Sequence, residues 1–81
     1  MEKIGKITHF FDKINVAVLK LDGTLKVGNT IQIGDGDEAF EQEVTSMQVN
    51  HKDIKEAKAG DDVGLKTKQK TRAGANVYLA E

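Results

Sequence analysis

Two short phrases of the chain share one design, in which a glycine turn stands directly before a run of strand-forming residues. They are Leu25–Ile33, which reads LKVGNTIQI, and Ala59–Leu65, which reads AGDDVGL. Glycine readily takes the positive φ angles that tight turns require, and β-branched residues favour extended backbone. The two phrases therefore predict a chain built from short strands joined by tight turns.

Strand-like runs continue along most of the 81 residues, and helix has little support. Clusters of glycine or aspartate separate the runs, and Asp22-Gly23 is a hairpin-type turn signal. Proline is absent, so no position loses its backbone amide for strand pairing. We expect six strands, at 3–11, 14–21, 25–33, 40–49, 63–65 and 77–79. Closure removes the exposed edges of so small a sheet, so we predict an all-β fold, a small closed six-stranded β-barrel.

Two of these runs carry more detail. Ile14–Leu21 has apolar residues at both alternating positions, which predicts a central strand that is covered on both faces. Between Phe40 and Val49 the apolar positions change parity, so strict alternation cannot place all of them on one face. A β-bulge near Thr45 and Ser46 would restore the register.

The composition limits the cellular setting and the partners. Twelve lysine and arginine residues against 13 acidic residues give a net charge of −1, which provides no overall attraction to nucleic acid or to an anionic membrane. The absence of cysteine excludes disulfides and thiolate metal sites and fits a reducing cytoplasm. No signal peptide or membrane-spanning run is evident. We expect one domain, over residues 1–81, in a soluble cytoplasmic protein.

Three segments of the chain resemble parts of one known domain. Leu25–Ile33 resembles the "lkvGd-i-i" segment, and Ala59–Leu65 the "aGd-vg" segment, of the second-domain β-barrel of translational GTPases such as elongation factor Tu. The closing run Arg72–Ala80 is similar to the final "r-Gd-vla" strand of that domain. The likeness extends to small stand-alone elongation factor-like proteins, and a related barrel resembles the C-terminal domain of collagenase-like peptidases. It implies the same β-barrel and a non-enzymatic role in translation.

The chain departs from that family at functional positions. It lacks the Gly-x-x-x-x-Gly-Lys-[Ser/Thr] phosphate-binding loop, so no GTP binding is implied for this chain. Where the family has an asparagine in the region that contacts aminoacyl-tRNA, this chain has Asp62, an anion that repels RNA phosphates unless it is paired or protonated. The family's arginine-glycine near the end of the second strand is replaced by Asp22-Gly23. We therefore carry over the barrel and not the aminoacyl-tRNA pocket.

The strongest candidate for a binding site is a run of alternating cations. If the backbone stays extended there, the two-residue spacing places all of them on one face, where they can follow a phosphate backbone. Intervening Thr67, Gln69 and Thr71 would add hydrogen bonds, whereas the alternative is a solvated strand end that discourages edge pairing. The predicted nucleic-acid-binding residues are Lys66, Lys68, Lys70 and Arg72, with His51 and Lys52 as an extension from the turn after the fourth strand.

An acidic stretch is the counterpart of this run. It contains Asp35, Asp37, Glu38, Glu41 and Glu43 without a basic residue between them. Its spacing does not match a calcium-binding loop, so a solvated hairpin or a surface that docks a basic partner is favoured over a metal site.

Catalytic chemistry has little support in the sequence. His9 and His51 lie far apart, and Ser46 is the only serine. We predict no enzyme activity, no cofactor and no metal. The aromatic residues Phe10, Phe11, Phe40 and Tyr78 are assigned mainly to the core, with a stacking surface for single-stranded bases as the alternative.

Two hypotheses for function follow from these observations. The first is a non-enzymatic module that binds tRNA or ribosomal RNA weakly through the basic residues. The alternative is a protein–protein adaptor, or an accessory barrel for a larger partner.

Overall fold

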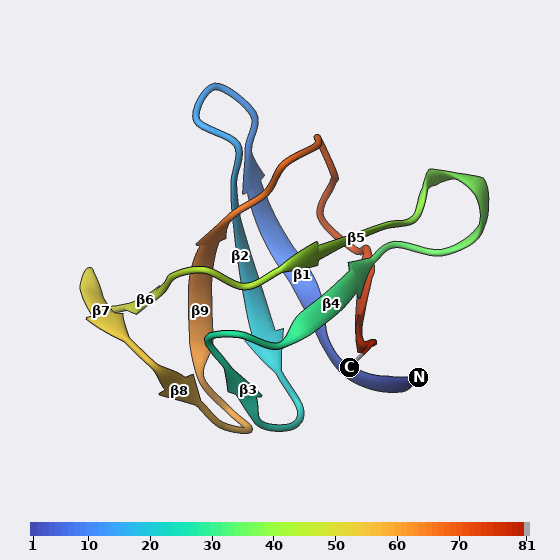
Figure 1. Cartoon of the computed structure of the whole chain (residues 1–81). Helices are drawn as coiled ribbons and strands as arrows, with labels where there is room; N and C mark the ends of the chain where they lie inside the picture. The colour runs from blue at the N-terminus through green and yellow to red at the C-terminus, as the bar shows by residue number, and fades with distance from the viewer. Residues whose placement is uncertain (81) are drawn as a thin grey trace.

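The computed structural model describes residues 1–80 and shows an all-β fold, which confirms the predicted class (Figure 1). Nearly all of the regular structure in these residues is short strand, with a single 3₁₀ turn, η1 (Gly36–Glu38). The strands are β1 (Glu2–Phe11), β2 (Val16–Leu21), β3 (Leu25–Lys26), β4 (Thr30–Ile33), β5 (Phe40–Glu43), β6 (Met47–Val49), β7 (Lys52–Ile54), β8 (Glu56–Ala57), β9 (Asp62–Lys66) and β10 (Asn76–Leu79).

The main sheet is antiparallel throughout and has the order β5-β4-β10-β1-β2-β9-β6-β7, while β3 and β8 form a second, two-stranded sheet. Figure 1 shows β1, β2 and β9 side by side, with the β4–β5 loop and the β6–β7 hairpin projecting at opposite sides. The main sheet curls into a half-barrel, and the ladder of the described residues leaves β5 and β7 as its edges. The described residues therefore show an all-β, curled sheet, and not the predicted closed ring of six strands.

One side chain joins the β5 edge to the far end of β9. The amide nitrogen of Gln42 donates to the carbonyl of Lys66 at 2.8 Å, and its amide oxygen accepts from the backbone N–H of Lys68 at 2.9 Å. These two bonds replace a backbone ladder between the strands. They also fix the backbone of the basic run at its start.

The core lies inside the curl of the sheet and, apart from the buried Thr67, the buried side chains among residues 1–80 are apolar. They are Ile4, Ile7, Ala17, Leu19, Leu21, Leu25, Ile31, Ile33, Phe40, Val44, Met47, Ala57, Val63, Leu65 and Val77.

Strand β2 is central, between β1 and β9, as predicted. Only one of its faces is buried in the core, because Ala17, Leu19 and Leu21 point inward whereas Val16 and Val18 are half-buried. The prediction that both faces are covered is therefore wrong for residues 1–80.

The predicted change of parity between Phe40 and Val49 falls in the irregular residues 44–46, which separate β5 from β6. Phe40, Val44 and Met47 are all buried. Val44 exchanges backbone bonds with the turn before β4, since it donates to the carbonyl of Asn29 and accepts from Gly28, both at 2.8 Å. The irregularity thus keeps the apolar side chains on the core side.

The turn predictions hold in part. Gly28 has a φ of 101° and separates β3 from β4, as the phrase around it predicts. Asp22-Gly23 does lie between strands, but it forms a corner and not a hairpin, because β3 pairs with β8 and β2 pairs with β1 and β9. None of the described helical turns is long and apolar enough to cross a membrane.

Candidate nucleic-acid interface

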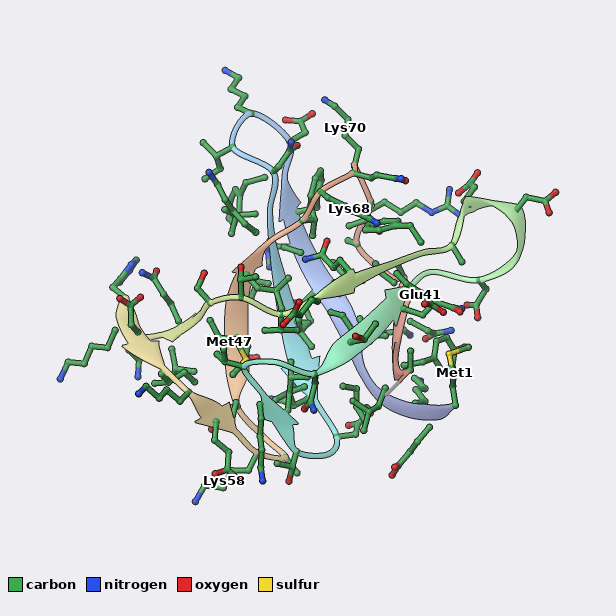
Figure 2. The ribbon with its side chains drawn as sticks, in the orientation of Figure 1. Met1, Glu41, Met47, Lys58, Lys68 and Lys70 are labelled. Atoms are coloured by element: carbon green, nitrogen blue, oxygen red, sulfur yellow. The ribbon has the colours of Figure 1, made fainter. Side chains whose placement is uncertain are left out.

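The predicted cations lie on the segment 66–72, called the basic segment below. Lys66, Lys68, Lys70 and Arg72 are all exposed, and Figure 2 shows Lys70 pointing away from the ribbon with Lys68 next to it in the same segment. However, strand β9 ends at Lys66, and the residues after it are irregular. The extended stripe that the spacing predicts does not continue beyond Lys68.

Thr67 faces inward between the exposed Lys66 and Lys68, so the alternation continues as far as Lys68, where the chain bends. Thr67 is 6% exposed, its backbone N–H donates to the carbonyl of Asn15 at 2.8 Å, and its hydroxyl donates to the same oxygen at 3.3 Å. This threonine is therefore part of the fold and does not offer the outward hydrogen bonds that the sequence suggests.

The second half of the basic segment faces the end of strand β1. Lys70, Thr71 and Arg72 line an open cleft of about 460 Å³ together with Thr8 and His9, called the basic cleft below. Its lining also includes Phe10, Asp12 and Ala73. Two cations and an imidazole thus border a space that is large enough for a phosphate group, together with one carboxylate, that of Asp12. The Thr8 hydroxyl donates to the carbonyl of Val18 at 3.1 Å.

Arg72 lies near one carboxylate at ion-pair distance, that of Glu38. The guanidinium lies 3.9 Å from a carboxylate oxygen of Glu38, and both side chains are about 80% exposed. An ion pair this exposed contributes about 1 kcal/mol at most. Arg72 can therefore exchange Glu38 for a phosphate at little loss.

Beside the basic cleft, His9 stacks on Phe11 with ring centroids 6.3 Å apart and an interplanar angle of 12°. Phe11 is 49% exposed, whereas Phe40 is buried, Phe10 packs against the core and Tyr78 is half-buried. The core assignment is thus correct for Phe40 and wrong for Phe11. A register shift between Ile7 and His9 in the β1–β2 ladder turns His9 and Phe11 to the outer face.

His51 and Lys52 lie apart from this surface. They are exposed at the turn of the β6–β7 hairpin, where Asn50 and His51 have φ angles of 54° and 64°. Figure 1 shows that hairpin at one side of the molecule and residues 67–72 at the top. His51 lines a different hollow, together with Asp62, and neither His51 nor Lys52 lines the basic cleft.

The acidic stretch is divided between the β4–β5 connection, with Asp35, Asp37 and Glu38, and the exposed Glu41 and Glu43 of β5. Among residues 1–80, no three His, Cys, Asp or Glu side chains are grouped in a way that could hold a metal ion.

Asp35 anchors the β4–β5 connection to strand β10. It accepts hydrogen bonds from the Tyr78 hydroxyl at 2.6 Å and from the Asn76 amide at 2.9 Å. These two bonds, the tyrosine bond first, hold the pKa of Asp35 below its ordinary value. The same carboxylate raises the pKa of Tyr78, because ionisation of the phenol would end its bond to Asp35.

We expect the Tyr78→Phe variant to be less stable than the wild type near neutral pH, by an amount that depends on pH. The lowered pKa of Asp35 gives stability above the unfolded aspartate pKa of about 3.9, which is lost as the pH falls through the folded-state pKa. The raised pKa of Tyr78 gives stability below about pH 10, which is lost as the pH rises through its folded-state pKa. The urea midpoints of the wild type and the variant, measured from pH 2 to 11, should differ most between pH 5 and 9. A difference in midpoint that is the same at every pH would contradict this assignment.

Comparison with known proteins supports the fold and the resemblance. Residues 16–79 match the family described as elongation factor Tu domain 2. The chain is 44% identical over 78 residues to "Uncharacterized protease MJ0090" of Methanocaldococcus jannaschii, a match that covers 95% of this chain and 19% of that protein. The chain therefore spans about a fifth of the length of this curated relative.

Two solved structures share the fold. Both are of the C-terminal domain of a Geobacillus thermoleovorans putative U32 peptidase, one of them as its selenomethionine variant. The variant has a TM-score of 0.89 at 14% identity, covering 96% of this chain and 99% of that domain. The other has a TM-score of 0.91 at 13% identity, covering 99% and 93%. Identities this low show the fold alone, but the family match over residues 16–79 shows that the chain belongs to the elongation factor Tu domain 2 family.

Proposed function

We propose that the chain is a non-enzymatic, elongation factor-like β-barrel module that binds tRNA or ribosomal RNA weakly through the basic segment. The observation that carries the proposal is the basic cleft beside the exposed His9–Phe11 stack. Proteins that bind single-stranded nucleic acid combine cations that follow the backbone with aromatic rings on which bases stack. The cleft and the stack supply both elements on adjoining surfaces. A cytoplasmic location, where tRNA and ribosomes are found, is part of this proposal.

The charge distribution sets the expected strength. Only four cations lie on the basic segment, the whole chain has a net charge of −1, and Arg72 already has Glu38 as a neighbour. Each phosphate that is neutralised on a single strand contributes a slope of about −0.7 to the dependence of log K on log salt. We therefore expect weak binding, with a slope between about −2 and −3.

Reversing the charge of the basic segment should abolish this binding. In the variant with Lys66, Lys68, Lys70 and Arg72 all changed to glutamate, we expect an affinity at least about tenfold lower at 50 mM salt, because four phosphate contacts become repulsive. The measurement is fluorescence anisotropy of labelled tRNA and of a labelled single-stranded RNA, titrated at several salt concentrations.

A matched control separates local contacts from net charge. Changing four other exposed lysines to glutamate makes the same change in total charge at positions outside the basic segment; they are Lys3, Lys26, Lys55 and Lys58. The control should bind more tightly than the basic-segment variant. Equal losses in the two variants would mean that no specific surface binds RNA.

We also propose that the barrel serves a larger protein, either as an accessory domain or as a separate partner. The likeness to longer proteins supports this second element of the proposal. The chain covers a fifth of a relative that is named as a protease, and both similar structures are described as C-terminal domains. We propose that the barrel positions substrate or partner and that any bond cleavage takes place elsewhere in such a protein. Mixing the purified chain with the part of the Methanocaldococcus relative that lies outside the match tests this by analytical ultracentrifugation: a joint species supports it, and separate species at about 100 μM contradict it.

A further inference from the structure

An apolar cluster on the outer face joins strand β2 to the end of β1, and among residues 1–80 no element covers it. The β6 and β9 side of the same face is polar, with Gln48, His51 and Asp62. Val16 and Val18 are half-buried there, and Phe11 and Ile14 are 49% and 58% exposed. These side chains line an open hollow of about 450 Å³. Exposed large apolar side chains that gather around one hollow are typical of an interaction site, whereas scattered ones are not.

Gly64 forms the middle of this hollow, opposite Val18 on β2 and Gln48 on β6. Its φ angle is not positive, and an added Cβ would meet only the carbonyl oxygen of Gln48, at 3.9 Å. The fold therefore has room for a side chain here. A glycine inside a strand lowers stability, and it often marks a place where a ligand or another chain approaches closely.

The two ends of the hollow carry opposite charges. Asp62 and Lys66 stand two residues to either side of Gly64 on β9, so both point to the outer face. Asp62 lines the hollow, and Lys66 lines an adjoining one that shares Val16, Gln48 and Gly64. Strand β9 is paired with β2 along its whole length and with β6 at Gly64, so the face that it offers a partner here is one of side chains.

We propose that this hollow docks an extended segment of a partner protein, which places one apolar side chain over Gly64 with a basic residue facing Asp62 and an acidic residue facing Lys66. The apolar part of the lining, with Ile14, Val16 and Val18, favours a side chain such as leucine. The carboxylate of Asp62 disfavours a nucleic-acid strand, whose phosphates it would repel. The site does not depend on RNA binding, since the basic cleft is lined by other residues.

Synthetic peptides test the proposal directly. Three seven-residue peptides are used, with leucine, phenylalanine or glycine at the central position. Each carries a lysine two residues to one side of the centre and a glutamate two residues to the other. A single-stranded RNA of seven nucleotides is the probe for nucleic acid as the competing occupant. Each is titrated into the ¹⁵N-labelled chain to a few millimolar, with amide shifts followed by NMR. We expect saturable shifts at Val16, Val18, Gln48 and Gly64 with the leucine and phenylalanine peptides, and affinity at least about tenfold lower for the glycine peptide.

Two variants check the site. Gly64→Val fills the hollow and should remove the shifts while the melting temperature stays close to that of the wild type. Asp62→Lys should lower the affinity for the leucine peptide about threefold, which is the effect expected of an exposed ion pair. The same variant should raise the affinity for a leucine peptide whose lysine is replaced by glutamate.

Three outcomes would overturn the proposal. They are the absence of saturable shifts in the hollow with the leucine and phenylalanine peptides, equal binding of the glycine peptide, and RNA binding at the hollow that Gly64→Val removes. The basic-segment variant shares Lys66 with this site, so RNA binding is also measured in a variant that keeps Lys66 and changes Lys68, Lys70 and Arg72 to glutamate. With that variant, either proposal can fail while the other holds.

Discussion

The Gly5→Ala variant should lose about 3 kcal/mol of unfolding free energy, the upper range for an overpacked site. An added Cβ at Gly5 would lie 2.6 Å from the carbonyl oxygen of Lys20 and 3.1 Å from a methyl group of Leu19. Both residues belong to β2, the strand paired with β1, so its backbone would have to move. Domains of this size have about 5–15 kcal/mol in total. Urea denaturation followed by far-ultraviolet circular dichroism measures the loss.

Gly64→Ala is the matched control, since Gly64 is also a glycine inside a paired strand. The nearest atom to its added Cβ is 3.9 Å away, so no neighbour has to move. We expect this variant to be as stable as the wild type or more stable by up to about 1 kcal/mol, because glycine lowers strand stability. Similar losses in the two variants would show that close approach to β2 is not what requires glycine at position 5.

The Leu19→Ala variant should lose about 2–5 kcal/mol, as is usual for a leucine removed from a tightly packed core. Leu19 is fully buried at the centre of β2 and lies opposite Val63 of β9. Among residues 1–80 the core has fifteen apolar side chains, so few neighbours can move to fill the cavity. Urea midpoints, with the slope of the transition as a check on two-state unfolding, measure this effect.

Val18→Ala is the comparison for Leu19→Ala, because Val18 is the next residue of β2 and points to the outer face. We expect this variant to lose less than about 1 kcal/mol of unfolding free energy. Val18 is only half-buried, so its side chain gains less from leaving water than Leu19 does. A loss as large as that of Leu19→Ala would mean that the outer face is covered in solution, for example by self-association.

The sequence pattern predicts the strands well where alternation is simple. β9 and β10 follow from the alternating pairs Val63/Leu65 and Val77/Leu79, and the irregularity at 44–46 follows from the change of parity around it. The extent of β1 is also predicted, although register shifts interrupt its alternation. β7 and β8 are missed, because Lys52–Ile54 and Glu56–Ala57 are short and mostly polar and form through backbone pairing. No pattern of residues in the sequence predicts such strands.

The candidate site is predictable in residue type and not in shape. The cations of the basic segment are exposed, but their common face depends on extended backbone, which is interrupted by bends at residues 68 and 69. The contribution of His9 and Phe11 depends on a one-residue register shift in β1, which reverses the face of every residue after it. Alternation alone assigns these two residues to the opposite side of the strand.

The apolar outer face is a second feature that the sequence predicts only in part. Two apolar parities in Ile14–Leu21 predict cover on both faces, but no element of residues 1–80 covers the outer one. The pattern therefore identifies a surface suited to contact but says nothing about what makes the contact.

The most direct test of the account is an NMR titration of the ¹⁵N-labelled chain with a short single-stranded RNA and with tRNA at low salt. We predict that the largest amide shifts fall on Thr8, His9, Phe11 and residues 66–72, and that raising the salt reverses them. The absence of shifts at millimolar RNA, or shifts confined to the β6–β7 hairpin and the acidic β4–β5 connection, would contradict RNA binding through the basic segment.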